Sequence, residues 1–231
     1  MKEIFNSSYY ESNKQNKDRI GNIFYYNVIK KNFNFKSYLD YGCGLGFLLK
    51  RIEKDKKIKV ISGYDINKFA ICKSKENTSR SVIYENIEDI KDKFDLISIL
   101  HIIEHIDDDN LKETFSKIKK LLNKDGNLLI ATPAKNALAH ILKKNSWIGY
   151  KDKTHINLKT KNEWITFFKN ENFNVVKISN DGLWDNFYGQ FTFSLKFIKI
   201  FLIMILQIFT GKLTLSYYEG ETFIFILKKN D

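Results

Sequence analysis

The sequence predicts an α/β protein whose core is a doubly wound, mostly parallel β-sheet. Segments with helical periodicity alternate with short apolar segments along the chain, which is typical of such sheets. An apolar run leads into an acid and three alternate glycines at Asp40–Gly46, D-Y-G-C-G-L-G. Asp65 and His101–His105 follow two other predicted strands. Because ligands bind at the carboxyl ends of the strands in these sheets, the three places are expected to form one site.

The composition indicates one globular unit. A length of 231 residues allows one sizeable core, and 43% hydrophobic with 28% charged residues is ordinary for a globular protein. We therefore expect a single domain over residues 1–231. It has an N-terminal helical segment, residues 1–34, and two insertions, residues 134–160 and 183–220, that form a lid on the substrate side.

The elements of the first half follow from their apolar spacing. After a polar start comes a helix over about residues 17–31, and then the strand that enters the glycine turn. A short amphipathic helix begins at Phe47. Residues 59–64 are the second strand, residues 67–75 a helix whose first residue, an asparagine, is its N-cap, and residues 81–84 a short third strand.

The second half opens with a buried strand, residues 94–100, which is almost continuous in apolar side chains. A helix over residues 107–122 starts with three acids, which suit the positive end of its dipole. Asp125-Gly126 is predicted as a turn before a strand over residues 127–132, closed by Pro133. The remaining expected elements are a helix over residues 161–172 and strands over residues 173–178 and 221–228.

The glycine turn narrows the class of ligand. A dinucleotide fingerprint, G-x-G-x-x-G, needs a glycine at position 47, where the chain has Phe47, and the third glycine is Gly46 instead. Asp40 lies two residues before Gly42, where its carboxylate would repel a pyrophosphate. The turn favours a nucleotide-like ligand with a positive group, and the alternative is a tight turn without a ligand.

Two later positions fit an adenosine. Asp65 ends the second strand, 19 residues after Gly46, and its carboxylate can accept hydrogen bonds from both ribose hydroxyls. The alternative is a strand-end acid that caps the next helix. Asn86 and Ile87 follow the third strand, where an amide can bind the adenine amino group and an apolar side chain can pack on the ring. The alternative there is a solvated loop.

Taken in order, these motifs resemble those of the class I S-adenosylmethionine-dependent methyltransferases. The matching segments are D-Y-G-C-G-L-G, Asp65 after G-Y, N-I-E-D-I, F-D-L-I-S-I-L-H-I-I-E-H-I and L-L-N-K-D-G-N-L-L-I-A-T-P, within about residues 38–178. The resemblance is to the branch with the ubiquinone-biosynthesis O-methyltransferases and many bacterial enzymes of surface-polysaccharide pathways. It implies a Rossmann-like fold with a seven-stranded, mostly parallel sheet and a small helical lid. It also implies S-adenosyl-L-methionine as the cofactor.

The resemblance further implies which residues bind this cofactor. The glycine turn would line the methionine part and the ribose, Asp65 would bind the ribose hydroxyls, and the segment at Asn86 would contact adenine. The family usually has an acid where Asn86 stands. The complete implied set is Asp40, Gly42, Cys43, Gly44, Gly46, Asp65, Ile66, Asn86, Ile87, Leu100 and His101.

The segment His101–His105, H-x-x-E-H, allows three interpretations. A zinc metallopeptidase needs both histidines on one long helix, whereas here His101 ends a strand and the next helix starts near Asp107. Relatives with E-x-x-E-H here are thought to bind a divalent ion, but His101 replaces the first acid, which weakens a site for a hard cation. We therefore predict no metal. His105 is a candidate general base, with helix capping or ordering of the cofactor pocket as the structural alternative.

His155 is the second candidate catalytic residue. The stretch K-D-K-T-H-I-N-L resembles the D-P-x-H stretch of these relatives, with Lys153 where proline is usual. His155 would act as a base or contact the substrate, and the alternative is a loop histidine without a role. Trp147, Tyr150 and Trp184 have flat faces that suit sugar rings and equally fill cores.

The charge and the cysteines exclude other classes. The net charge is +11, but the chain has three arginines among its 38 basic residues. Phosphate-reading surfaces favour arginine, so we expect no specific nucleic-acid partner. Cys43 and Cys72 lack metal-type spacing and are predicted as buried, reduced thiols. With a polar N-terminus that shows no secretory signal, this favours a cytoplasmic location.

Residues 200–209 are almost wholly apolar, and lysines lie at positions 196, 199 and 212. This run is shorter than the roughly 20 residues that cross a bilayer. A packed helix over the substrate pocket or at a dimer contact is the preferred interpretation, and peripheral membrane contact is the alternative. The chain is expected to be a monomer or a homodimer.

The predicted reaction is methyl transfer from S-adenosylmethionine to a hydroxyl, or with less support an amine, of a small molecule. The preferred acceptor is a sugar or sugar-linked intermediate of surface-polysaccharide synthesis. Quinone-type and phosphoamine-type acceptors stay open. The rivals from other classes are an NAD-dependent oxidoreductase, which Phe47 argues against, and a non-catalytic nucleotide-binding module.

Overall fold

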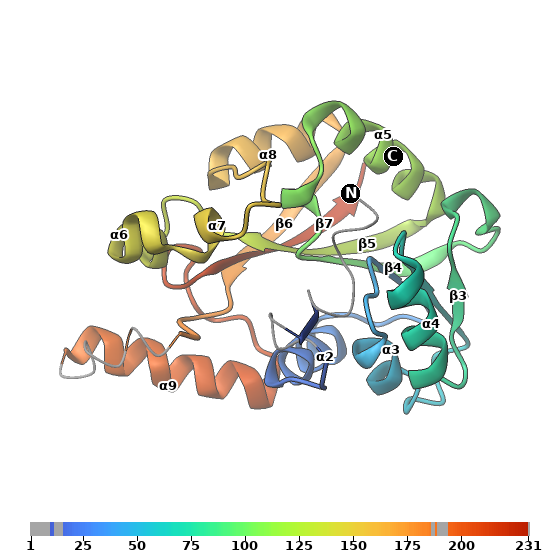
Figure 1. The fold of residues 1–231 in the computed structure, drawn as a ribbon, viewed down its shortest axis with the longest axis horizontal. Helices are drawn as coiled ribbons and strands as arrows, with labels where there is room; N and C mark the ends of the chain where they lie inside the picture. Colours follow the sequence, from blue (N-terminus) through green and yellow to red (C-terminus); the bar gives the residue numbers. More distant parts are fainter. Residues whose placement is uncertain (1–9, 12–15, 186–187, 189–193, 231) are drawn as a thin grey trace.

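The computed structural model describes residues 10–11, 16–185, 188 and 194–230 and has a seven-stranded sheet with helices on both faces (Figure 1). The strand order is β3-β2-β1-β4-β5-β7-β6. Pairs from β3 to β5 are parallel, whereas β7 runs antiparallel to β5 and β6. The strands are β1 (Ser37–Tyr41), β2 (Val60–Tyr64), β3 (Val82–Tyr84), β4 (Phe94–Leu100), β5 (Leu122–Pro133), β6 (Phe173–Asn180) and β7 (Thr222–Lys229).

The helices form two layers around this sheet. In Figure 1, α2, α3, α4 and α9 lie below the sheet, α5 and α8 lie above it, and α6 and α7 lie at one end. The described α-helices are α2 (Ile20–Asn32), α3 (Phe47–Ile52), α4 (Lys68–Asn77), α5 (Asp108–Leu121), α6 (Leu138–Lys143), α7 (Ile148–Lys151), α8 (Lys161–Asn170) and α9 (Leu195–Thr210). The short 3₁₀ turns are η1 (Ile87–Asp89), η2 (Ile103–His105) and η3 (Lys144–Ser146). The predicted α/β class and mostly parallel sheet are confirmed.

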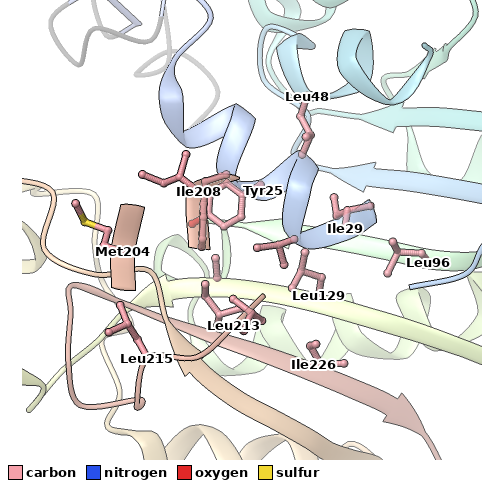
Figure 2. Packing of buried hydrophobic residues seen from close by; sticks show 14 of the residues in the cluster. Tyr25, Ile29, Leu48, Leu96, Leu129, Met204, Ile208, Leu213, Leu215 and Ile226 are labelled. Carbon is pink, nitrogen blue, oxygen red and sulfur yellow. The ribbon is translucent and has the colours of Figure 1, made fainter. Parts of the chain in front are cut away.

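Each face of the sheet has its own apolar cluster. On one face, Ile29 of α2, Leu48 of α3 and Ile208 of α9 pack with Leu129 of β5 (Figure 2). On the other face, aromatic side chains of α5 and α8 dominate, and the ring of Trp164 stacks on that of Phe168 with centroids 5.7 Å apart. The sheet is therefore buried on both sides, which explains the continuous apolar run of β4.

Two helix starts follow the predicted capping chemistry. The Asn67 side chain accepts a hydrogen bond from the Ala70 N–H at 3.0 Å at the start of α4. At the start of α5, the Asp107 carboxylate accepts from the Asn110 N–H at 3.1 Å. Each cap satisfies a backbone donor that the helix itself leaves without a partner.

Two predictions were wrong. Asp125-Gly126 is part of the long strand β5 and lies at an irregularity where the pairing with β4 shifts register between Phe94 and Leu96. Cys72 is exposed, because α4 turns Ala70, Ile71 and Ser74 inward and leaves Cys72 on its outer face. Asp and Gly are typical of turns but also occur in strand irregularities, and a cysteine is usually buried but can lie on the outer face of a helix. Residue type alone therefore gave the wrong prediction at both places.

The apolar run at residues 200–209 lies inside α9, a helix of 16 residues. Within the residues that the structure describes, no helix combines the length and the apolar content needed to span a bilayer. The predicted N-terminal segment and the insertion over residues 183–220 fall partly outside the described residues.

Candidate active site

A cavity of about 680 Å³ opens at the carboxyl ends of the parallel strands. Its size is within the usual range of small-molecule pockets. Residues of α2, of the segment 148–155 and of the chain between the end of β6 and the start of β7 also line it. The predicted site residues that line it are Asp40, Gly42, Cys43, Gly44, Asp65, Ile66, Leu100, His101, His105 and His155.

Gly44 and Asp65 form a backbone-to-carboxylate contact at the cavity wall. The Gly44 N–H donates to Asp65 Oδ2 at 2.9 Å, and the Asn67 N–H donates to Oδ1 at 2.9 Å. A carboxylate offers about four lone pairs, so Asp65 keeps acceptor capacity toward a hydroxyl hydrogen. Burial raises the pKa of Asp65, and the backbone donors oppose this rise. The predicted ribose role and the helix-capping alternative are thus compatible, since one carboxylate can do both.

Gly44 and Gly46 are needed for different reasons. Both have positive φ angles, of 51° and 79°. Among the residues that the structure describes, a Cβ on Gly44 would have only the Tyr10 side chain within 4 Å, at 3.9 Å, and Gly44 lines the cavity with its backbone. A Cβ on Gly46 would lie 2.7 Å from Ser74 Oγ and 3.1 Å from Ser74 Cα. Gly46 therefore allows α3 to approach α4, and it does not line the cavity.

This difference gives a matched pair of variants. Gly44→Ala is expected to lower the free energy of unfolding by about 1–2 kcal/mol, the cost of a left-handed alanine, while abolishing measurable binding of S-adenosylhomocysteine. Gly46→Ala adds a clash of the new Cβ with the Ser74 side chain and a tight contact with Ser74 Cα, so it should lose more stability. Denaturant unfolding and calorimetric titration of both variants measure the two effects. Equal binding by Gly44→Ala and the wild type would contradict the assignment.

Asp40 is a buried acid at the end of β1, 4% exposed. The Ser98 hydroxyl donates to Asp40 Oδ1 at 2.5 Å, and the Tyr38 hydroxyl lies 2.6 Å from the same Ser98 oxygen. Burial raises the pKa of Asp40 to about 7, with a smaller contribution from the neighbouring charge of Asp65. A cationic group in the cavity would stabilise the ionised form of Asp40.

Asn86 and Ile87 are not among the residues that line the cavity. The Asn86 side chain accepts from the Glu88 N–H at 3.2 Å and caps η1, and Ile87 packs into the apolar cluster under α5. Their contact with adenine stays a prediction.

His105 sits at the end of a chain of hydrogen bonds. The Thr154 hydroxyl donates to Asp152 Oδ1 at 2.5 Å, so its oxygen is an acceptor toward His105 Nδ1 at 3.0 Å. The Thr154 carbonyl, which can only accept, lies 3.2 Å from the same nitrogen. Nδ1 must therefore carry the proton, which puts the lone pair of the neutral ring on Nε2. Burial lowers the pKa of His105 and thereby favours that neutral form.

His155 lies beside His105, with ring centroids 4.8 Å apart. Its Nδ1 is 3.0 Å from the Gly149 carbonyl, and its Nε2 is 3.8 Å from Asp152 Oδ2. Both predicted histidines therefore share one end of the cavity. Glu104, His105 and His155 each offer one potential ligand atom, all within 4.8 Å of one another, so this group could hold a metal ion.

Glu104 and His101 join this end of the cavity to α2. Glu104 is fully buried; its Oε2 accepts from the Thr132 hydroxyl at 3.1 Å, and its Oε1 lies 3.4 Å from His101 Nδ1. His101 Nε2 is 2.9 Å from the Tyr25 hydroxyl. Burial alone would raise the pKa of Glu104, but the neighbouring imidazoles of His101 and His105 and a backbone hydrogen bond together outweigh it and lower that pKa.

The sequence matches the protein family described as "Methyltransferase domain" over residues 10–178, well over half of the chain. The chain belongs to this family. It is a class I S-adenosylmethionine-dependent methyltransferase, as the order of motifs predicted, and S-adenosyl-L-methionine is its cofactor.

Relatives of this methyltransferase agree with that assignment. One is the mitochondrial ubiquinone biosynthesis O-methyltransferase of Saccharomyces cerevisiae, 30% identical over 79 residues that cover 31% of this chain and 25% of the yeast protein. The match thus spans about a quarter of the length of that relative. Among solved structures, the plantazolicin methyltransferase BpumL, in complex with a pentazolic desmethylPZN analog and SAH, has a TM-score of 0.65 at 18% identity, covering 97% of this chain and 91% of that one. An S-adenosylmethionine-dependent methyltransferase from Archaeoglobus fulgidus has a TM-score of 0.65 at 20% identity, covering 97% and 100%. At these identities the two structures show the shared fold.

The cavity of this methyltransferase fits its cofactor. The open backbone at Gly44 leaves room for a ligand, Asp65 retains acceptor lone pairs for a ribose, and the buried carboxylate of Asp40 suits a positive group. These residues would hold S-adenosylmethionine at the ends of β1 and β2.

Several lining residues were not predicted from the sequence. Tyr25 comes from the N-terminal helix, Asp181 directly follows β6, and Glu221 directly precedes β7. Asp181 is a strand-end acid like Asp65, so the same signal could have found it. Tyr25 and Glu221 carried no local signal, because only packing brings α2 and β7 to this cavity.

Proposed function

We propose that this methyltransferase acts on a hydroxyl group of a neutral, hydroxyl-rich small molecule, with a sugar or sugar-linked intermediate of surface-polysaccharide synthesis as the preferred acceptor. The observation that carries the choice of oxygen is the chain of hydrogen bonds from Asp152 through Thr154 to His105. We place the reaction in the cytoplasm, which keeps thiols reduced, since Cys43 and Cys72 are both free.

The proposed mechanism combines alignment with proton removal. Bound S-adenosylmethionine supplies an electrophilic methyl group on a positively charged sulfur. Holding the acceptor oxygen in line with that group can lower the barrier by several kcal/mol, up to about 7–11. His105 Nε2 accepts the hydroxyl proton as the oxygen forms its bond to the methyl carbon and the carbon–sulfur bond breaks, which leaves S-adenosylhomocysteine as the neutral thioether product. A base of this kind adds about 10²- to 10⁴-fold. His155, oriented by the Gly149 carbonyl and Asp152, contacts the acceptor.

The lining of the cavity supports a neutral acceptor. Its carboxylates are more numerous than its basic side chains, since Arg19 is the one lysine or arginine among the lining residues that the structure describes. Asp181, directly after β6, and Glu221, directly before β7, both line the cavity, and Trp184 adds a flat aromatic face. Carboxylates accept hydrogen bonds from hydroxyls and repel phosphates, so this lining disfavours a phosphoamine-type acceptor.

A quinone-type acceptor is the second candidate. The specific observation in its favour is the similarity to the yeast ubiquinone biosynthesis O-methyltransferase. A phenolic hydroxyl is more acidic than a sugar hydroxyl and depends less on a base. The two acceptor classes are therefore expected to respond differently to loss of His105.

A binding assay followed by an acceptor panel tests the proposal. At a concentration 100 times its dissociation constant, S-adenosylhomocysteine should raise the melting temperature by roughly 5–10 °C, whereas NAD should not. Formation of S-adenosylhomocysteine from S-adenosylmethionine is then measured with neutral sugars and glycosides, catechol-type quinone precursors and phosphoethanolamine. We expect turnover with the sugar class. Turnover confined to catechols or to phosphoethanolamine would contradict the proposed acceptor, and stabilisation by NAD alone would contradict the cofactor.

A further inference from the structure

Helix α9 exposes one continuous row of large apolar side chains. They recur at intervals of three or four residues, so they share one face of the helix. Leu195 and Phe209, at the two ends of the row, are 84% and 76% exposed. The full row, each member more than 40% exposed, is Leu195, Ile198, Phe201, Leu202, Leu206 and Phe209.

The opposite face of α9 is firmly attached to the domain. Met204 and Ile208 pack into the apolar cluster that also contains Tyr25 and Ile29 of α2 (Figure 2). The Asn27 side chain donates to the Ile208 carbonyl at 2.7 Å. The buried Gln207 side chain accepts from the Leu215 N–H at 2.8 Å. The helix orientation is therefore fixed by one face. The other face, an apolar ridge made by the row listed above, is exposed to solvent, and α9 itself lies along the outside of the molecule (Figure 1).

The charged side chains of α9 and of Lys212, just after its end, have one sign. Lys196 and Lys199 lie in the first turns of α9 and Lys212 just after its end, all three exposed. The sequence from residue 194 to residue 212 contains no acid. On a helical projection at 100° per residue, Lys199 and Lys196 lie along one edge of the apolar row, between Leu206 and the buried face of the helix. An apolar stripe bordered by lysines is the pattern of a helix that lies in a membrane interface.

We propose that α9 docks this methyltransferase on the surface of an anionic lipid membrane, with its apolar row among the acyl chains near the headgroups and its lysines on the lipid phosphates. Charge complementarity selects this occupant over a second copy of the chain. Two α9 helices packed face to face would bring only lysines together, with no acid on either helix to pair with them. The inference does not depend on which acceptor is methylated.

Docking through α9 would place the cavity close to the membrane. Met204 of α9 packs directly under Gly182, where an added Cβ would lie 2.7 Å from Met204 Cγ, and the neighbouring Asp181 lines the cavity. The inner face of α9 also touches α2, which lines the cavity through Tyr25.

Vesicle co-sedimentation of the full chain tests this proposal. The vesicles contain either phosphatidylcholine alone or 70% phosphatidylcholine with 30% phosphatidylglycerol, at about 0.1 M salt, where charges separated by more than roughly 10 Å are screened. We expect binding at least tenfold tighter to the anionic vesicles, and weakening as salt increases. The double variant Leu202→Gln/Leu206→Gln and the double variant Lys196→Glu/Lys199→Glu should each lose at least tenfold in binding. Val82→Gln, which changes an exposed apolar residue on the edge strand β3, is the matched control and should bind like the wild type.

The thermal shift with S-adenosylhomocysteine verifies that every variant is folded, because none of the changed residues lines the cavity. Absence of binding to anionic vesicles by the folded wild type would overturn the proposal. So would equal binding by the wild type and both double variants. Light scattering that shows a dimer which Leu202→Gln/Leu206→Gln dissociates, without vesicle binding by the wild type, would assign the face to a second copy instead.

Discussion

Replacing Asp40 by asparagine is expected to make the ligand-free protein more stable and to weaken its binding of S-adenosylmethionine. Burial raises the pKa of this carboxyl from 3.8 to about 7, so the folded state resists its ionisation. Between these two pH values the unfolded chain ionises first, and the stability of the folded state therefore falls as pH rises. The penalty is complete above pH 7 and amounts to at most about 4 kcal/mol, at 1.36 kcal/mol per pKa unit.

Denaturant unfolding at pH 5 and pH 8 measures this effect. Asp40→Asn should gain about 2–4 kcal/mol over the wild type at pH 8 and far less at pH 5. Asp95→Asn is the control with the opposite sign. Burial alone would raise the pKa of Asp95 too, but hydrogen bonds from the Lys36 and Ser37 N–H groups and from Asn123 outweigh it and lower that pKa. Asp95→Asn should therefore lose stability at pH 8.

The same variant is expected to lose affinity for the cationic cofactor. In the wild type, affinity should rise with pH up to about pH 7, because the positive charge of S-adenosylmethionine favours the ionised form of Asp40. Asp40→Asn should bind S-adenosylmethionine at least tenfold more weakly than the wild type at pH 8, and its affinity should depend less on pH. Burial also raises the pKa of Asp181 to about 7, so Asp181 can account for the remaining pH dependence. Isothermal titration of the wild type and the variant at pH 6 and pH 8 measures the loss of affinity and its pH dependence. A destabilised variant with unchanged affinity would contradict the role of Asp40.

Removing the imidazole of His105 is expected to lower kcat by roughly 10²- to 10⁴-fold with a sugar-type acceptor, since the proton acceptor is lost. Binding of S-adenosylhomocysteine should stay within about twofold of the wild type. Because burial lowers the pKa of His105 below its usual 6.5, wild-type kcat should be flat above neutral pH and fall in acid as the base becomes protonated. His155→Ala should mainly raise KM, since we propose that its ring contacts the acceptor.

His140→Ala is the matched control for both histidine variants, because the His140 ring packs beside Trp147 and does not line the cavity. Initial rates are measured before and after treatment with a chelator. Activity that disappears with the chelator and returns with one added divalent ion would favour a metal on Glu104, His105 and His155 over the base. Full turnover by both His105→Ala and His155→Ala would remove the histidines from the mechanism.

The cofactor end of the site could be predicted because its signals are local. Asp40, the glycine turn and the start of α3 lie within one strand-turn-helix unit, and Asp65 terminates the adjoining parallel strand. In such a unit the backbone geometry follows from the residue types themselves. The same holds for the caps at Asn67 and Asp107, where a side chain bonds the backbone three residues later.

The end of the cavity that contains His105 and His155 could be predicted only in part. His105 and His155 stood out as residue types, but their proximity and the link through Thr154 depend on the folding of residues 152–155 over η2. Tyr25, Asp181 and Glu221 come from three distant parts of the chain, and no sequence spacing connects them. Their meeting depends on the insertion of β7 between β5 and β6 and on the packing of α2 below the sheet.

The sequence by itself determined the strand-turn-helix unit, the class of cofactor and the apolar character of residues 200–209, because each depends on neighbouring residues. The tertiary structure alone decided which face of that apolar helix is covered. Met204 and Ile208 find partners in the domain, whereas Leu202 and Leu206 do not lie in any of its buried clusters. All four side chains are apolar, so the sequence alone does not distinguish them. Which of them is buried depends on the surface that packs against the helix.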